Sequence, residues 1–506
     1  MGRRTRSILL IALACVGCRH EPAFVPDTAF AHARAEFEQG ELAAAAADAE
    51  KGLQVLDGID ANGAWRFRAL QAEVFIWQGR GRDALALLAP EPIGPVSDQI
   101  KAQRLCLMGQ AANNLPKLQD DAVRYVGAAA DLVATRAPQF AGEVALTQGT
   151  LRWTRQDLDG ADGHFRRALD IAQTLHKPFL EASARGSLGL VRMQRHQYAD
   201  AVDWFQSAAA VATSIQARAS AEKSTGNLGW AYLSMGELDR AQDLFTEAEA
   251  QARRYGLLRD QQIWLSSLGG LQMSRRDYES AEANFRQALS IARKLENKTQ
   301  VAQNLTSLAT ALLRRDQVDE ADRTNAEALV LKREAKARDS ELYSLVTQAD
   351  IAIHRTDPTQ AIQLLGEVIR DAKTNLRLSA EAQAKLATVH AGQGDPARAN
   401  QEYREAIVTI EQARDVLGRE EFKLPFATNA KPIYDAYVGF LMDRGNEASA
   451  CAIADLSRAQ TLTQGLGVRP PFSTGDFVTA DRGCSKPSRG VVLAYGWRRS
   501  AAISGC

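Results

Sequence analysis

Two sets of polar residues recur along the sequence at the spacing of a repeat, and both could contact a ligand. The first set consists of small amide and hydroxyl side chains at nearly constant intervals: Gln148, Ser187, Asn227, Ser267, Ser307 and Gln348. Because all of these groups both donate and accept hydrogen bonds, they could bind the main chain of an extended peptide. The alternative interpretation is a solvated polar face without a ligand.

The second set is basic and runs parallel to the first. Its members, with Met235 interrupting the series, are Arg155, Arg195, Arg275, Arg315 and Arg355. Arginine makes bidentate contacts with carboxylates, so the series could form a basic edge that selects acidic peptides. Arginines near helix ends would also offset the negative end of the helix dipole, by about 0.3–1 kcal/mol each. The sequence leaves both interpretations open.

The sequence contains no motif that would by itself assemble a catalytic or metal site. It lacks an HExxH zinc motif, a glycine-rich phosphate loop and paired cysteines at metal-ligand spacing. No histidine is placed to form an evident dyad with Cys451 or Cys484. The histidines are His20, His32, His164, His176, His196, His354 and His390. We therefore expect no catalysis, cofactor or metal, and we expect Cys106 and Cys451 to be buried as small apolar side chains.

The elements that must position the two polar sets follow from a stricter periodicity. Alanine recurs at a constant 40-residue interval, at Ala161, Ala201, Ala241, Ala281, Ala321 and Ala361. Four positions after the first four alanines come Phe165, Phe205, Phe245 and Phe285. Twelve positions before the alanines come Gly149, Gly189, Gly229, Gly269, Ala309 and Ala349. Small residues at both places let two helices cross closely, and the phenylalanine fills the space toward the next pair.

Each unit of this repeat therefore predicts two amphipathic helices joined by a short turn. In LGWAYLSMGELDRAQDLFTEAEAQARRYG the turn is marked by Gly236. Looser copies are centred on Ala45, Ala84, Ala122, Ala399 and Ala450, which makes about eleven helix pairs. One pair alone cannot bury its apolar face, so the pairs must stack into a continuous core.

This pattern resembles the tetratricopeptide repeat over residues 25–417. The matching positions in one unit are Leu228, Gly229, Tyr232, Ala241, Phe245 and Ala248. The common unit has about 34 residues, so these units are similar to a longer variety, and the scarcity of a closing proline fits a second helix that runs on. The resemblance implies an all-α, right-handed superhelical solenoid whose concave face is lined by the first helices. It also implies that the first polar set contacts a protein or peptide ligand.

The N-terminal residues indicate export. Three arginines precede an apolar stretch from Ile8 to Val16, and Gly17 comes just before Cys18. This resembles a bacterial lipobox, which implies a signal peptide over residues 1–18, lipidation of Cys18, and a membrane-anchored lipoprotein facing the periplasm or the cell exterior. The chain has 61 basic and 61 acidic residues, a balance that argues against a nucleic-acid partner.

The C-terminal residues depart from the repeat. Residues 421–467 predict a last helix pair divided near Gly445, and residues 468–506 are expected to be a disordered linker ending in a strand at Val491–Tyr495. These two segments resemble the region that enters the caspase-like catalytic domain of bacterial TPR–CHAT proteins, truncated after its first strand. Restoring one nucleotide after the Tyr495 codon can convert the final residues to WLAPQRSYLWL, so a frameshift is one explanation and a natural tail is the other.

Three functions therefore remain open from the sequence. The first is an exported, lipid-anchored scaffold or sensor that binds a protein or peptide and has no catalytic activity. The second is the N-terminal part of a TPR–CHAT cysteine peptidase whose catalytic domain is lost by frameshift or truncation. The third is a purely structural assembly scaffold.

Overall fold

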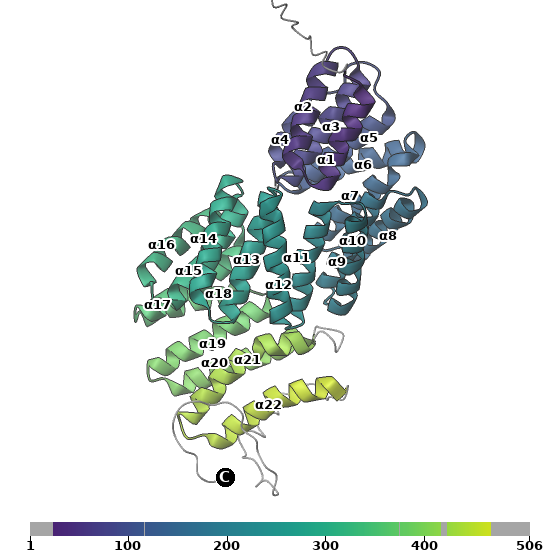
Figure 1. Cartoon of the computed structure of the whole chain (residues 1–506). Coiled ribbons are helices and arrows are strands. Elements are labelled where there is room, and N and C mark those ends of the chain that lie inside the picture. The colour runs from purple at the N-terminus through teal and green to yellow at the C-terminus, as the bar shows by residue number, and fades with distance from the viewer. Residues whose placement is uncertain (1–23, 116, 374, 416–422, 467–506) are drawn as a thin grey trace, which may run out of the picture. The chain divides into compact units, whose positions relative to one another are not determined.

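The predicted all-α fold of stacked helix pairs is confirmed. A computed structural model describes residues 24–115, 117–373, 375–415 and 423–466, and within these residues the chain forms helices and turns without strands (Figure 1). There are 22 α-helices in the described part, which makes eleven pairs as expected. The proposed signal peptide and lipidated Cys18, the linker of residues 468–506 and the strand Val491–Tyr495 all lie outside the described residues.

The described chain divides into two compact units, a division that the repeat pattern did not predict. The first unit contains residues 24–76 and 81–140, and the second contains residues 77–80 and 141–466. The helices of the first unit are α1 (Pro26–Gln39), α2 (Leu42–Leu56), α3 (Ala61–Trp77), α4 (Gly81–Leu88), α5 (Asp98–Asn113), α6 (Gln119–Thr135) and the 3-10 helix η1 (Pro138–Phe140). The 40-residue spacing is lost in this unit because α4 is short and an irregular connection containing prolines separates it from α5.

The second unit carries the regular repeats. Its helices are α7 (Ala141–Thr154), α8 (Leu158–Thr174), α9 (Pro178–Gln194), α10 (Tyr198–Ser214), α11 (Arg218–Ser234), α12 (Leu238–Arg254), α13 (Leu258–Ser274), α14 (Tyr278–Lys294), α15 (Lys298–Arg314), α16 (Val318–Glu334), α17 (Arg338–His354), α18 (Pro358–Asp371), α19 (Leu376–Gly392), α20 (Pro396–Asp415), α21 (Lys423–Met442) and α22 (Glu447–Leu466). The odd-numbered helices are the first helices of their pairs, and the even-numbered helices are the second.

The 40-residue period is split evenly between the two helices of a pair. Every helix from α8 to α17 has 17 residues, and three-residue turns separate them. The extra length is thus shared between the two helices of each pair. Each turn contains a residue with positive φ, such as Gly236 at 83° or His196 at 58°. The backbone amide of this residue donates a hydrogen bond to a carbonyl of the preceding helix, and the helix ends there.

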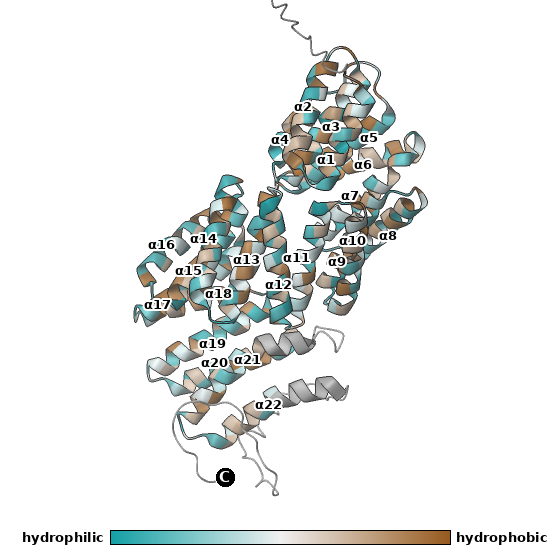
Figure 2. Cartoon of the chain, viewed as in Figure 1, coloured by the Kyte–Doolittle hydropathy of each residue, from teal (hydrophilic) through white to brown (hydrophobic). Residues whose placement is uncertain are grey.

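The alanine and phenylalanine positions form the core between helices. All six alanines of the 40-residue series are 0% exposed, and Phe205 and Phe245 are fully buried as well. Each phenylalanine ring lies against the glycine of the preceding helix: a Cβ added to Gly229 would lie 2.7 Å from Cε1 of Phe245. Apolar and polar residues are interspersed along the helices that Figure 2 colours by hydropathy.

One pair replaces this apolar packing with polar side chains. In α16, Asn325 stands at the phenylalanine position and Lys332 at a position that is alanine in earlier pairs, yet these two side chains are only 0% and 4% exposed. The Lys332 ammonium donates to Thr306 Oγ1 at 2.7 Å, to Ser344 Oγ at 2.8 Å and to the Ser340 carbonyl at 3.0 Å. Burial lowers the pKa of Lys332 to about 8.

The prediction that two cysteines are buried is confirmed for one of them and wrong for the other. Cys106 is buried on α5 as predicted, but Cys451 on α22 is exposed. The prediction for Cys451 was wrong because its neighbour Ala450 takes the buried face of the helix and turns the cysteine outward. Among the described residues, no helix has the length and apolar content needed to span a membrane.

Candidate functional site

First helices of neighbouring pairs contact one another directly from α7 to α21. We call the surface formed by α7, α9, α11, α13, α15, α17 and α19 the first-helix face. Polar residues that are almost fully buried gather on these helices. They include Glu222, Asn227, Asp260, Gln262, Asn304, Ser344 and Thr347. A buried polar side chain must find a partner to offset its lost hydration, so these residues make a polar seam between helices.

Hydrogen bonds connect this seam from α13 to α17. Gln262 donates to Gln300 at 3.3 Å, and Ser266 on the same helix donates to Asn304 at 2.7 Å. The hydroxyls of Thr306 and Ser344 lie 2.8 Å apart. Side chains with both donor and acceptor groups thus hold successive first helices in register.

Between α11 and α13 the seam contains two carboxyl groups and two indoles. The Trp264 indole donates to Glu222, and the Trp230 indole donates to Ser267 at 2.9 Å. The ring centroids of Trp230 and Trp264 are 5.2 Å apart in an edge-to-face arrangement. Burial and then the nearby Asp260 raise the pKa of Glu222 to about 9, so this carboxyl group holds a proton at neutral pH.

The six residues of the first polar set all lie on first helices, but they are not equally accessible. Gln148 and Ser307 are half-buried, whereas Asn227 is only 6% exposed. The Ser187 hydroxyl donates to its own helix at the Ser183 carbonyl, 2.8 Å away. Ser267 accepts from Trp230, as described above. Their role in binding a peptide stays a prediction.

Two members of that set are offset by one position from the others. Ser187, Asn227, Ser267 and Ser307 occupy equivalent places in helices of equal length, and the residues at the same place in α7 and α17 are Thr147 and Thr347. Gln348 consequently points toward its own hairpin partner, where its amide donates to Asp322 at 2.8 Å and accepts from Asn325 at 2.9 Å. Strict counting by the alanine period would have found Thr147 and Thr347.

The arginines of the second set each follow directly after the last residue of a first helix, as predicted. Four of them form ion pairs with acidic side chains of the preceding pair. Arg195 pairs with Asp159, Arg275 with Asp239, and Arg315 with Glu282. Arg355 reaches both Asp319, at 2.8 Å, and Asp322, at 2.6 Å. These ion pairs link consecutive helix pairs, and the selection of acidic peptides by this edge stays a prediction.

Charge reversal at two of these arginines should have unequal effects on stability. Asp239, the partner of Arg275, is 96% exposed, so we expect Arg275→Glu to lower the free energy of unfolding by less than about 0.5 kcal/mol. Glu282, the partner of Arg315, is 12% exposed, so Arg315→Glu places two carboxylates together in a drier site and should cost about 1–2 kcal/mol. Urea denaturation measures both; equal losses would contradict this ranking.

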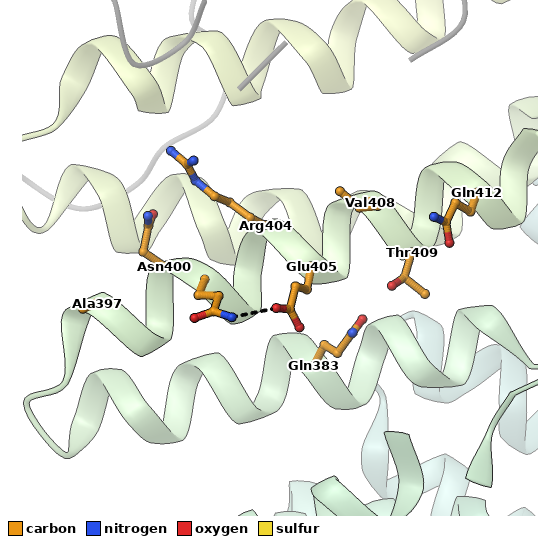
Figure 3. Close-up of a pocket in the computed structure, with 9 residues that line it drawn as sticks. Gln383, Ala397, Asn400, Arg404, Glu405, Val408, Thr409 and Gln412 are labelled. Atoms are coloured by element: carbon orange, nitrogen blue, oxygen red, sulfur yellow. Dashed lines mark hydrogen bonds between the residues drawn. The ribbon is translucent and has the colours of Figure 1, made fainter. Parts of the chain in front are cut away.

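A separate pocket lies along α20, away from the polar set. Its cavity volume is about 510 Å³, and it is lined by Gln383, Ala397, Asn400, Gln401, Arg404, Glu405, Val408, Thr409 and Gln412 (Figure 3). Gln401 donates to Glu405 at 2.9 Å, and Asn400 accepts from the Tyr437 hydroxyl at 2.8 Å. Nothing in the sequence indicated this pocket, because its lining is mostly a stripe of one helix that resembles any solvated face.

In the first unit, one histidine and two carboxylates come together on α1 and α2. His32 Nδ1 lies 3.0 Å from Asp48 and 3.7 Å from Glu36, and the His32 side chain is 65% exposed. This is the one group of three candidate metal ligands among the described residues. A hydrogen bond between His32 and Asp48 on neighbouring helices accounts for the arrangement, and we assign no metal to it.

The paired helices, the 40-residue period and the first-helix face together define a tetratricopeptide-type helical solenoid. Residues 180–254, which span α9 to α12, match the tetratricopeptide repeat family model. Comparison with curated proteins gives no sequence match. The truncated caspase-like domain that the sequence suggested finds no support in these comparisons.

Solved structures share the fold at low sequence identity. The apo form of RapI is 12% identical with a TM-score of 0.50, over 69% of this chain and 98% of RapI. A Rap protein complexed with Competence and Sporulation Factor is 12% identical with a TM-score of 0.51, over 69% of this chain and 98% of that one. The apo quorum sensor NprR from B. thuringiensis is 12% identical with a TM-score of 0.51, over 68% and 97% of the two chains.

Proposed function

We propose that this protein is a non-catalytic scaffold or sensor that binds a peptide or a protein segment on its first-helix face. The observation that carries the proposal is the recurrence of donor and acceptor side chains on consecutive first helices, among which Gln148 and Ser307 are only half-buried. The fold it shares with a Rap protein complexed with Competence and Sporulation Factor, and with the quorum sensor NprR, supports it.

A blocking substitution on the first-helix face tests this function. Ser307 is half-buried in the middle of α15, and Ser307→Arg would place a long cation on this face, whereas Thr246→Arg places the same side chain on the exposed surface of α12. Peptides selected on the immobilised full chain from a random heptapeptide library should bind Ser307→Arg at least about tenfold more weakly. Fluorescence anisotropy gives the affinities.

The control variant Thr246→Arg should keep the affinity of the unmodified protein, with both variants showing the same helical circular dichroism. If Ser307→Arg bound every selected peptide as tightly as Thr246→Arg, the first-helix face would not be the binding surface. Failure to recover any binding peptide would argue instead for the assembly-scaffold interpretation, which sedimentation would show as self-association.

We further propose that the protein is exported and anchored to a bacterial membrane through a lipid on Cys18. The apolar stretch and the small residue before Cys18 support this localisation. Expressed in a bacterium with a lipoprotein pathway, the full chain should fractionate with membranes and carry an acylated Cys18 by mass spectrometry. Cys18→Ser should abolish both; an unmodified, soluble chain beginning at Met1 would contradict the proposal.

A further inference from the structure

The first-helix face holds two buried carboxyl groups close together, on α11 and α13. Glu222 is 0% exposed and Asp260 is 5% exposed. The charged groups whose fields reach Glu222 are Asp260 on the facing helix and Lys223 on its own helix. Two buried carboxylates next to one lysine would leave an excess of negative charge, which is costly away from water.

Only one of the two oxygens of the Glu222 carboxyl group has a hydrogen-bond partner among the described residues. Its Oε1 accepts from the Trp264 indole, whereas its Oε2 is buried and has no hydrogen-bond partner among the described residues. Gly226, one turn along α11, leaves room for the Trp264 ring that delivers this hydrogen bond. The site therefore holds a buried carboxyl group whose second oxygen has no partner among the described residues.

Lys223 shows that a cation can approach this pair from the surface. Its side chain is 42% exposed, and its Nζ lies 3.7 Å from Oδ2 of Asp260, whose side chain is 7% exposed. That separation is longer than a hydrogen bond. The same ammonium lies 4.3 Å from the centroid of the Trp77 ring. Asn227, a predicted peptide contact, lies on the same helix one turn further along.

We propose that Glu222 and Asp260 form a subsite that receives an ammonium or guanidinium group of the bound peptide, in exchange for a proton on Glu222. This inference rests on the proposed peptide-binding function and adds the chemistry of the ligand: a peptide with a lysine, an arginine or a free N-terminus at this point. It differs from the acidic-peptide selection that the arginine series suggested.

The exchange conserves charge at the site. In the free protein, Glu222 is protonated and Asp260 lies beside Lys223. As the cation enters, the O–H bond of Glu222 breaks, its proton passes to solvent water, and the carboxylate accepts a hydrogen bond from the incoming N–H group. Lys223 stays beside Asp260. The entering positive charge equals the proton released, so no uncompensated carboxylate is buried at any stage.

The Trp264 indole provides a reporter that needs no natural ligand. The full chain, labelled with 5-fluorotryptophan, can be followed by fluorine NMR, with Trp264→Phe identifying the signal. We expect the Trp264 signal to titrate with a midpoint above neutral pH and to lose this titration in Glu222→Gln. Glu249→Gln, which alters another buried glutamate on α12, should leave the titration unchanged.

The probes are Nα-acetylargininamide and its neutral isostere Nα-acetylcitrullinamide, at equal ionic strength. At neutral pH the arginine amide should move the Trp264 signal toward its alkaline position and lower its midpoint by at least about one pH unit, which corresponds to a tenfold preference for the ionised site. The citrulline amide should have no effect. Identical responses to the two amides, or a Trp264 signal that does not titrate, would overturn the proposal even if the variants failed to fold.

The same samples separate this inference from the proposed function. If the amides act alike while library peptides still bind the first-helix face, only the cation subsite is wrong. If the arginine amide acts as expected while no library peptide binds, the subsite stands and the peptide-binding function fails.

Discussion

Alanine substitutions at the adjacent residues Gly269 and Gly270 are expected to change stability in opposite directions. A Cβ on Gly269 would lie 2.6 Å from Cε1 of Phe285, inside the contact distance of two carbons, so Gly269→Ala should lower the free energy of unfolding by about 2 kcal/mol. Gly270 has nothing within 4 Å of an added Cβ, so Gly270→Ala should raise it by about 0.5–1 kcal/mol. Urea denaturation of the two variants measures both values.

A second substitution tests the cause of the loss at Gly269. The pair α17/α18 has Ala349 and Leu365 at the places of Gly269 and Phe285, and both are 0% exposed. Phe285→Leu should therefore relieve Gly269→Ala, with a coupling energy of at least about 1 kcal/mol in a double-mutant cycle. Additive effects would mean that the glycine is needed for some reason other than the ring that covers it.

The buried Lys332 should make the protein more stable as the pH rises from about 8 to 10.5. Burial lowers its pKa from the ordinary 10.5 to about 8, so over this range the unfolded chain binds a proton that the folded chain has released. Stability must increase with pH wherever the unfolded state binds more protons. Relative to Lys332→Met, the unmodified protein should gain on the order of 2 kcal/mol across this window.

The comparison with Lys332→Met isolates one titration, because both proteins share every other ionisable group. Lys298→Met, at a side chain that is 78% exposed, serves as the control and should run parallel to the unmodified protein. Chemical denaturation at a series of pH values gives the curves. A constant difference between the protein and Lys332→Met would show that the Lys332 ammonium is as well solvated in the fold as in the unfolded chain.

The helix pairs could be predicted because their packing requires particular residue sizes at fixed intervals. Only alanine or glycine allows close helix crossing, so the 40-residue series appears in the sequence, and even the looser copies at Ala45, Ala84 and Ala122 are 0% exposed. The division into two units after Phe140 could not be predicted in the same way, because no residue of the repeat pattern marks it.

The candidate site was only partly predictable because a polar residue on a helix looks the same in the sequence whether it faces water or a neighbouring helix. Glu222 and Asp260 carried no signal of their own, since their burial arises when α11 meets α13. The ion pairs of the arginines could be predicted from the sequence more easily than the buried carboxyl groups. An aspartate lies 36 residues before Arg195, Arg275 and Arg355, in each case a residue with which the arginine pairs.

The equal division of the period has a consequence for how this chain can change in length. From α8 to α17, each helix with its turn takes up half of the 40-residue period. Any stretch that is one period long therefore contains the equivalent of one first helix and one second helix, wherever the stretch starts. If such a stretch is removed or duplicated, the alanine-bearing helix at the new junction again packs against a helix with glycine or alanine at the crossing point. The junction therefore has the same kind of packing as the junctions in the present chain. Contacts reach only to near neighbours in a solenoid, so the number of units is a tunable property, and the length of the first-helix face can vary without redesign of its parts.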